Sequence, residues 1–399
     1  MNVLVLNCGS SSAKFAILDT DSGEERVAGL AQRLGSEKAT LEWKVAGRKE
    51  SQDIPGADHG RALRAAVEVL ERLGLARGLS AVGHRVVHGG ARFSGSMVVD
   101  AEVLAKVEQC IPLGPLHNPP NLLGIAIARE LFPELPQVAV FDTAFHQTMP
   151  PRAYLYPVPY AWYEELEVRR YGFHGTSHRF VAQQAVRQLG LAPGDHALVT
   201  AHLGNGCSLT AVRDGESIDT TMGLTPLEGV AMGTRSGSVD PALVGHVARE
   251  LGQPAEKVIE ALNKESGLLG LSGLSNDMRT LQEAADAGHD RAQLAIDVFC
   301  YALAKAVASL VVPLGRLDAL VFTGGIGENS AAVRARVLKQ LGFLGLTVDP
   351  VANMSHGRAQ RGRITREERP LAAVVPTNEE LMIALDTAEL VRGPARAAA

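Results

Sequence analysis

The sequence predicts an α/β protein of two similar domains, each with a mixed sheet. Segments with strand character alternate with segments of helical periodicity, but they do not form one regular βαβ series. A strand–turn–strand pattern occurs twice, at residues 3–19 and 198–214, about half a chain apart. The length of 399 residues is enough for about two domains of ordinary size.

The first of these segments, VLVLNCGSSSAKFAILD, predicts two paired strands joined by a phosphate-binding turn. Apolar residues end at Asn7, Gly9 and three serines follow, and the apolar run resumes at Phe15. Small residues in the turn leave backbone N–H groups and serine hydroxyls free to face an anion. The second copy has His202 in the place of Asn7 and Gly204 in the place of Gly9. We therefore expect each domain to direct a phosphate loop at a shared cleft.

The other elements of the N-terminal half follow from the spacing of apolar residues. Residues 60–75 have helical spacing, and Asp100 is placed to cap a helix over 100–110. The proline-rich segment 112–121 is expected to be a shaped loop without regular structure, and a helix is expected after it. Strands are expected within 29–54, at 81–87 and at 137–141.

The C-terminal half is predicted in the same way. Residues 143–170 are rich in proline and tyrosine and are expected to cross into the second domain. Thr377 and Glu380 form a capping-box pattern, which leaves Glu379 in the first helical turn, where it can face a cation. Helices are expected at 175–189, 240–251, 254–263, 290–310, 330–341 and 379–391, and strands at 317–322 and 371–375.

The composition is that of a soluble globular protein, with 46% hydrophobic and 21% charged residues. The net charge is −5, and the sequence contains no long block of charged residues of one sign. Bulk binding to nucleic acid or to an anionic membrane is therefore not indicated. The four cysteines have no CxxC spacing and no signal-peptide pattern is visible, which predicts a reducing, cytoplasmic compartment. Residues 292–314 are very apolar but contain Asp297 and Lys305, and they predict a buried helix rather than a membrane span.

A glycine-rich turn at residues 323–329, TGGIGEN, leaves a predicted strand and opens a predicted helix. Its N–H groups and the helix dipole suit a nucleotide phosphate or ribose, and the alternative is an ordinary glycine turn. The chain has no P-loop, no GxGxxG dinucleotide fingerprint, and neither the HRD nor the DFG motif of protein kinases. If this turn binds a nucleotide, the protein belongs to another class of nucleotide-binding proteins than these three.

Cationic side chains stand beside apolar residues and glycines in three segments, 84–90, 170–178 and 233–237. An arginine beside glycines can approach an anion closely and bind it with two parallel hydrogen bonds. The alternative for each arginine is a surface ion pair. These segments are therefore candidate anion sites.

Two kinds of metal site are considered. The histidine pairs His84/His88 and His174/His178 have i,i+4 spacing, which raises zinc as an alternative, but neither pair lies in an HExxH motif. His84 and His178 are expected to be structural. Magnesium needs only one or two oxygen ligands together with phosphates and water. Asp142, at the end of an apolar strand, and Glu379 are the candidate acids.

The motifs taken together closely resemble the acetokinase family over nearly the whole chain. The matching motifs are NCGSSSAKF at 7–15, HRVVHGG at 84–90, PLHNPPN at 115–121, FDTAFH at 141–146, RRYGFHGTSH at 169–178, HLGNG at 202–206, GTRSG at 233–237, SNDMR at 275–279, GGIGEN at 324–329 and TNEE at 377–380.

The resemblance implies two duplicated ribonuclease-H-like domains of the actin and hexokinase type around a nucleotide cleft. One domain would comprise residues 1–146 and 379–399, with a returning C-terminal helix, and the other residues 147–378. It also implies reversible phosphoryl transfer between ATP and acetate, giving acetyl phosphate and ADP, with Mg²⁺ as cofactor, for which Mn²⁺ can substitute. The expected assembly is a cytoplasmic homodimer that has no nucleic-acid or membrane partner.

The resemblance also assigns roles to residues. Asp142 is implied as the catalytic acidic residue, and His174 and Arg235 as the pair that stabilises the transition state. Arg85 would bind the substrate, and Asn7 and Glu379 would hold magnesium. Val87, Leu116, Phe173 and Pro226 would form the pocket for the acyl methyl group, with His117 nearby. The nucleotide contacts would be Lys14, His202, Leu203, Gly204, Asn205, Gly206, Asp277, Met278, Arg279, Gly325, Ile326, Gly327, Glu328 and Asn329.

Three departures from the family pattern and three alternatives remain. Ala13, Ala91 and Ser238 are atypical, and Ser238 puts in question the hydrogen bonding that orients Arg235. The first alternative is the same chemistry on propionate or butyrate, which the pocket around Val87 would decide because one methylene changes binding little. The others are a non-catalytic actin-like ATP-binding or filament protein and a zinc hydrolase.

Overall fold

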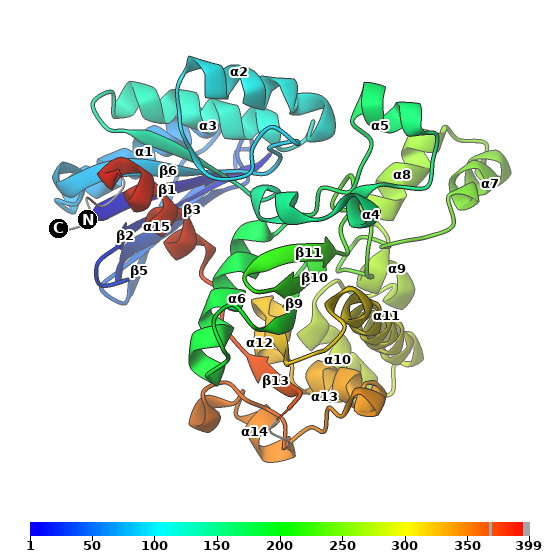
Figure 1. Cartoon of the computed structure of the whole chain (residues 1–399). Coiled ribbons are helices and arrows are strands. Elements are labelled where there is room, and N and C mark those ends of the chain that lie inside the picture. Colours follow the sequence, from blue (N-terminus) through cyan, green and yellow to red (C-terminus); the bar gives the residue numbers. More distant parts are fainter. Residues whose placement is uncertain (367–368, 394–399) are drawn as a thin grey trace. The chain divides into compact units, whose positions relative to one another are not determined.

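The computed structural model describes residues 1–366 and 369–393, and its contacts divide the chain into two compact units. Unit 1 comprises Met1–Gln147 and the C-terminal segment from Asn378, and unit 2 comprises Thr148–Thr377 (Figure 1). Residues 394–399, expected in the first domain, lie outside the described residues.

Unit 1 is built on an eight-stranded sheet with the order β5-β4-β3-β2-β1-β6-β8-β7. The first five strands form an antiparallel meander, β6 pairs in parallel with β1, and β8 pairs in parallel with β6. The bounds are β1 (Asn2–Cys8), β2 (Ser12–Asp19), β3 (Glu25–Gln32), β4 (Thr40–Val45), β5 (Arg48–Asp53), β6 (Leu79–Val86), β7 (Met97–Val98) and β8 (Gln137–Phe141).

Helices cover the two faces of this sheet unequally. Residues of α1 (His59–Arg72) and α3 (Asn118–Leu131) form one core with apolar side chains of β1 to β4. Helix α2 (Ala101–Gln109) packs beside α3, and Asp100 caps it as expected. On the other face, α15 (Glu379–Arg392) packs on β1, β6 and β8 through Ile383, Ala384 and Ala388. That face is therefore open over the outer strands.

Unit 2 has a five-stranded sheet with the order β11-β10-β9-β12-β13. Strands β9 to β11 are antiparallel, while β12 runs parallel to β9 and β13 runs parallel to β12. This is the order and direction of β3-β2-β1-β6-β8 in unit 1, so the predicted duplication and the ribonuclease-H-like fold class are confirmed. The bounds are β9 (Ala197–Leu203), β10 (Cys207–Arg213), β11 (Glu216–Thr220), β12 (Ala319–Thr323) and β13 (Leu371–Val374).

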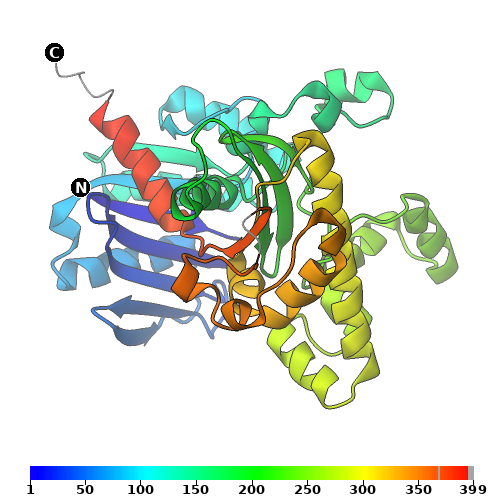
Figure 2. The same cartoon turned by 60° about the horizontal axis from the view of Figure 1, so that its bottom comes forward.

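Two long helices lie on opposite sides of this second sheet (Figure 1). Helix α6 (Gly175–Leu189) packs on β9 and β12, and α11 (Asp290–Leu314) packs on β9, β10 and β11 (Figure 2). The other helices are α4 (Pro151–Tyr154), α5 (Tyr160–Leu166), α7 (Ala242–Leu251), α8 (Ala255–Lys264), α9 (Gly267–Ser272), α10 (Met278–Asp286), α12 (Gly324–Asn329), α13 (Ala331–Gln340) and α14 (Pro350–Met354).

Helix α11 is, among the residues described, the one helix long and apolar enough to cross a membrane by length and composition. Its buried side chains include Ile296, Phe299 and Leu303, and the helix packs on the sheet of unit 2. One side of α11 thus lies in the core of unit 2, as the sequence predicts, while Leu294, Tyr301 and Val312 are exposed.

Two local predictions were wrong. The proline-rich segment was expected to be a loop up to Asn121, but α3 already begins at Asn118. Pro119 and Pro120 occupy the first turn, where N–H groups have no helical partner and proline is tolerated. The predicted capping box of Thr377 and Glu380 is also absent, because the side chain of Asn378 caps α15 and accepts from the N–H of Leu381 at 2.8 Å.

His84 in β6 is a structural residue that makes unit 1 sensitive to acid. Its side chain is 2% exposed, and its Nε2 lies 2.7 Å from Oε1 of Gln137. Burial lowers the pKa of His84 to about 4. Protonation is thus favoured in the unfolded chain, and stability is lost as the pH falls from about 6.5 towards 4.

We expect this one group to remove about 2 kcal/mol of stability at pH 5 relative to pH 7.5. Urea unfolding of the wild type and of His84→Met at both pH values measures this change in the free energy of unfolding. The variant should lose stability at both pH values because Gln137 is left without its donor, and its loss on acidification should be smaller by that amount. An equal loss on acidification in both proteins would contradict the expectation.

Candidate active site

Arg85, at the end of β6, is held in unit 1 by the carboxylate of Asp142, which follows β8. Its Nη2 donates to Oδ2 of Asp142 at 2.5 Å, and its Nε donates to both carboxylate oxygens at 3.1 Å. Nη1 of Arg85 donates to Oδ1 of Asn7 at 3.3 Å. Asp142 is fully buried, whereas the Arg85 side chain is 22% exposed. The pair therefore fixes the guanidinium of a side chain that stays partly exposed.

Acidic side chains at the start of α15 add to this cluster. Burial disfavours the charged form of Arg85, but Asp142, Glu379 and Glu380 oppose this, and the net effect raises the pKa of Arg85 above its usual range. Burial raises the pKa of Glu379 to about 7; Arg85 opposes the rise, and Asp142 and Glu380 add to it. The side chains of residues 7, 85, 142 and 379 thus form one electrostatic group. Of the predicted residues of unit 1, the group contains Arg85 for the substrate, Asp142 for catalysis, and Asn7 and Glu379 for magnesium.

Two asparagines that the sequence analysis did not single out shape the loop after Arg85. Asn121 accepts from the N–H of Val87 at 3.0 Å and donates to the carbonyl of Cys8 at 2.7 Å. Asn118 accepts from the N–H of His88 at 3.2 Å and donates to its carbonyl at 2.9 Å. Both asparagines are buried in the first turn of α3. Their positions in the motif PLHNPPN are the one signal that could have indicated them.

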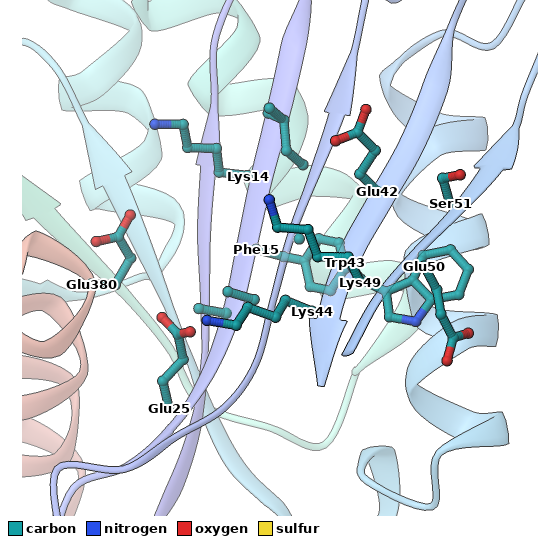
Figure 3. A pocket seen from close by; sticks show the side chains of 14 residues that line it. Lys14, Phe15, Glu25, Glu42, Trp43, Lys44, Lys49, Glu50, Ser51 and Glu380 are labelled. Atoms are coloured by element: carbon teal, nitrogen blue, oxygen red, sulfur yellow. The ribbon is translucent and has the colours of Figure 1, made fainter. Parts of the chain in front are cut away.

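Lys14 lies on the open face of the unit 1 sheet. A cavity of about 520 Å³ occupies this face over β2 to β5, and Lys14, Lys44, Glu42 and Glu380 are among its lining residues (Figure 3). Glu380 comes from the first turn of α15 and borders the same cavity. Lys14 is thus an exposed cation on unit 1, and it does not line the cavity of unit 2 that is described below.

In unit 2, His174 and Arg235 meet at Gly206. A Cβ atom placed on Gly206 would lie 3.4 Å from Nε2 of His174 and 3.4 Å from Nη1 of Arg235. Nη1 of Arg235 also donates to the carbonyl of Pro226 at 3.3 Å, and burial lowers the pKa of Arg235. His202 stacks on His174 with ring centroids 4.4 Å apart. A glycine at position 206 thus keeps a side chain out of the space that the imidazole of His174 and the guanidinium of Arg235 share.

Ser238, which departs from the family pattern, closes the loop that carries Arg235. Its N–H donates to the carbonyl of Gly229 at 2.9 Å, and its Oγ accepts from the N–H of Gly229 at 3.1 Å. Gly229 has φ 116°, which a side chain would not tolerate. The serine therefore supplies a local hydrogen-bond pair at this loop.

A cavity of about 630 Å³ in unit 2 brings together three sequence segments. Asn205 follows β9 and accepts at Oδ1 from Nδ2 of Asn276 at 2.9 Å, which joins two of the segments. The volume is within the usual range for a nucleotide-sized ligand. The predicted nucleotide residues that line it are Gly204, Asn205, Asp277, Met278, Arg279, Gly325, Ile326 and Asn329.

The other predicted nucleotide residues of unit 2 do not line this cavity. His202 stacks on His174, and its Nδ1 lies 2.8 Å from Oγ of Ser177. Leu203, Gly206 and Gly327 are not among the lining residues. Glu328 has a structural contact set: its Oε1 accepts from the N–H of Gly324 at 3.0 Å and from that of Thr377 at 3.1 Å. The carboxylate thus fixes the glycine turn.

The four predicted pocket residues fall in both units. Val87 is nearly buried and Leu116 is 68% exposed, and both belong to unit 1 together with His117, the residue before α3. Phe173 is buried beside His174 in the chain, and Pro226 bonds Arg235 through its carbonyl; both belong to unit 2. The predicted pocket residues are therefore divided between the two units, and Pro226 is the one with a hydrogen bond to its arginine among those described here.

Within residues 1–366 and 369–393 there is no group of three or more His, Cys, Asp or Glu side chains placed to hold a metal. His84 and His178 are buried and engaged with Gln137 and with Thr200 and Ser208. Asn7 and Glu379 offer oxygen atoms, which are the ligands that Mg²⁺ prefers. They fit a magnesium ion that takes most of its ligands from phosphates and water.

Comparison with known proteins shows the family of the chain. The family model of the acetokinase family matches residues 2–385. An acetate kinase of Chromobacterium violaceum is 54% identical over 98% of both chains, and one of Deinococcus radiodurans is 55% identical over 98% of this chain and 99% of the relative.

Two solved structures have the same fold over almost the full length. A propionate kinase from Francisella tularensis subsp. tularensis SCHU S4 has a TM-score of 0.93 at 43% identity and covers 97% of this chain and 99% of its own. The acetate kinase of Porphyromonas gingivalis has a TM-score of 0.91 at 42% identity, with 97% and 98% covered.

The duplicated fold, the nucleotide-sized cavity and these matches define an ATP-dependent phosphotransferase. The chain belongs to the acetokinase family.

Proposed function

We propose that this chain is an acetate kinase, which transfers a phosphoryl group reversibly between ATP and acetate. The observation that carries the proposal is the Arg85–Asp142 pair in unit 1. This partly exposed guanidinium is fixed by Asp142 and is not among the residues that line the nucleotide-sized cavity of unit 2. It suits a second, small anion.

The chemistry follows from charge. A carboxylate is already ionised at pH 7, so its attack on phosphorus needs no strong general base. The difficulty is to bring two anions together and to stabilise charge on the moving phosphoryl group. In the proposed direct, in-line transfer, Arg85 binds the carboxylate, and His174 and Arg235 donate to the phosphoryl oxygens. Asp142 orients Arg85 through three hydrogen bonds and keeps it charged.

Mg²⁺ is the proposed cofactor, held by Asn7 and Glu379 with Mn²⁺ as a substitute. When bound, it would neutralise charge on the phosphate oxygens. The raised pKa of Glu379 has burial as its main cause, and acidic neighbours add to it, which is what a site prepared for a cation shows before the cation binds. The remaining residues assigned by resemblance, Lys14 and the segments at 202–206, 277–279 and 325–329, are proposed to contact the nucleotide.

The domain assignment also remains a proposal: residues 1–146 with 379–399, and residues 147–378. We further propose a cytoplasmic homodimer with no nucleic-acid or membrane partner. Helix α7 supports an assembly through unit 2, because it is apolar along one side and yet none of its residues is buried. Light scattering during size-exclusion chromatography would test the dimer.

Substitution of His174 by alanine is expected to lower kcat by roughly 10² or more, as for the loss of one charge-stabilising donor. The role proposed for His174 is donation of a hydrogen bond, not nucleophilic attack. The measurement is a steady-state assay with ATP, Mg²⁺ and acetate, with the unfolding transition as a control for folding. A variant that keeps full activity would remove His174 from the mechanism.

The activity itself is tested by trapping acyl phosphate with hydroxylamine, with ATP and Mg²⁺ and with acetate, propionate or butyrate. We expect acetate to give the highest kcat/KM. A preference for propionate would support the second candidate, which the similarity to a propionate kinase favours. Val87→Ala should then shift the preference towards longer acids by roughly tenfold or more, since one methylene is worth about 1–3 kcal/mol. No acyl phosphate with any acid would contradict the proposal.

A further inference from the structure

A hydrogen-bonded chain of side chains stands behind His174. Nδ1 of His174 lies 2.8 Å from Oγ of Ser208, which lies 2.8 Å from Nε2 of His178. Nδ1 of His178 lies 2.7 Å from Oγ1 of Thr200. His178, Ser208 and Thr200 are fully buried. We call these four side chains the His174 chain.

The fold places the His174 chain between α6 and the sheet of unit 2. Thr200 on β9 and Ser208 on β10 point to the same face of the sheet, and His178 lies in the first turn of α6. His174 precedes α6 with φ 55° and ψ 24°, a left-handed conformation that residues other than glycine rarely adopt. Such conformations persist where the surroundings hold them, and they cluster at functional sites.

The distances show in which direction hydrogen bonds are donated along the His174 chain. The hydroxyl of Thr200 has one proton and two acceptors within reach, Nδ1 of His178 at 2.7 Å and the carbonyl of Thr210 at 3.4 Å. A hydroxyl prefers an acceptor within about 3.0 Å. Thr200 therefore donates to Nδ1 of His178. If Nδ1 of His178 donated to Thr200 instead, the proton of the buried Thr200 hydroxyl would have only the 3.4 Å contact with the carbonyl of Thr210.

The direction then fixes every later proton. A neutral imidazole carries one N–H, so His178, accepting at Nδ1, donates from Nε2 to Ser208. Ser208 uses its own single proton to donate to Nδ1 of His174. His174 is left with its proton on Nε2. This is the nitrogen that faces the space over Gly206, which it shares with Nη1 of Arg235.

We propose that Ser208, supported by His178 and Thr200, is a positioning residue that holds His174 as the Nε2–H tautomer. A neutral His174 can then donate a hydrogen bond to the transferring phosphoryl group without first gaining a proton. The inference rests on the proposed function for what the donated bond does. The tautomer itself is a property of the protein in the absence of substrates.

The test uses full-length protein labelled with ¹⁵N in its histidine side chains. Spectra that correlate ring protons with ring nitrogens report which nitrogen is protonated, and the His174 signals are identified by their loss in His174→Gln. In the wild type, Nδ1 of His174 should be unprotonated and Nε2 protonated. Ser208→Ala should give a mixture of the two tautomers, and Ser208→Thr, which keeps the hydroxyl, should preserve the wild-type pattern.

Kinetics of the same proteins separate positioning from general damage. Ser208→Ala should lower kcat by roughly tenfold, less than the loss of the His174 donor itself, with KM for ATP and for acetate changed by less than about threefold. Thr210→Val is the matched control, because Thr210 is buried on the same face but its hydroxyl bonds Thr220 instead. It should lose stability while keeping the tautomer and kcat.

A wild-type His174 with its proton on Nδ1 would overturn the proposal, and so would a Ser208→Ala variant with an unchanged tautomer. If Ser208→Ala does not fold, the wild-type spectrum and Thr200→Val decide, since the latter removes the donor that sets the direction. A wild type with the expected tautomer but no acyl-phosphate synthesis would remove the proposed function and leave the His174 chain as described.

Discussion

Replacement of Arg85 by methionine is expected to lower kcat/KM for acetate by about 10²–10³-fold, because removing one partner of a desolvated, hydrogen-bonded charge pair costs about 2–5 kcal/mol. The guanidinium is the cation proposed to bind the acyl carboxylate, and the hydrogen bonds to Asp142 fix its orientation. Arg85→Lys should recover only part of the activity, because an ammonium cannot reproduce the bidentate geometry. The hydroxylamine assay with varied acetate measures both variants.

A matched double variant separates catalysis from folding at this pair. Arg85→Met leaves the fully buried carboxylate of Asp142 without its cation, which should cost about 3–5 kcal/mol of stability. Arg85→Met combined with Asp142→Asn removes that buried charge, so stability should largely return while activity stays low. If the double variant regained activity as well, Arg85 would be a structural residue only. If Arg85→Met alone kept kcat/KM within tenfold, the substrate role would be lost.

Replacement of Arg334 by methionine is expected to destabilise the protein by about 3–5 kcal/mol, the cost of breaking a buried polar network. Arg334 in α13 is fully buried, and burial lowers its pKa to about 10, so it stays protonated at pH 7. Nη1 donates to the carbonyls of Gly327 and Glu328 at 2.8 and 2.9 Å. Nε and Nη2 donate to Asn353 at 2.8 Å, and Nη2 also donates to Nδ1 of His356.

This network ties the C-terminal carbonyls of α12 to α14, and α12 contributes Gly325, Ile326 and Asn329 to the nucleotide-sized cavity. We therefore expect KM for ATP to rise in any folded Arg334 variant, such as Arg334→Lys, more than KM for acetate. Arg358→Met is the control, because Arg358 lies two positions after His356, a partner of Arg334, but is exposed. Thermal unfolding and ATP titration of Arg334→Met, Arg334→Lys and Arg358→Met measure the changes in Tm and in KM for ATP. A Tm of Arg334→Met equal to that of the wild type would contradict the expected loss of stability.

Much of the fold was predictable because its elements have strong local signals. The helix expected at 175–189 and the strand at 137–141 have those bounds in α6 and β8. Helices α9 and α10 were not predicted. Helix α10 is amphipathic, with Met278 and Leu281 buried, but it has only nine residues, so its signal is weak in a window of 11–18 residues. Asn378 was missed as the cap of α15 because Thr377, one position earlier, fits the capping-box pattern.

The candidate site was predictable as a set of residues but not as a set of contacts. Arg85 reaches Asp142 because β6 and β8 are parallel neighbours with Arg85 opposite Val140, a register that no local pattern gives. Asn121 reaches Cys8 across 113 positions. Arg334 had no signal at all, because an arginine in a helix is normally a surface residue and its burial depends on Asn353.

The C-terminal helix α15 has a consequence for synthesis on the ribosome. The chain completes β8 by Phe141, but the apolar face formed by Val3, Val5, Val138 and Val140 packs against Ile383, Ala384 and Ala388 of α15, which begins at Glu379. Unit 1 therefore cannot complete its fold while all of unit 2 is translated. During that time it exposes an apolar surface of the kind that chaperones bind. Nascent chains stalled before Glu379 should show a protease-sensitive N-terminal portion beside a protected second unit, and release of the last helix should protect both.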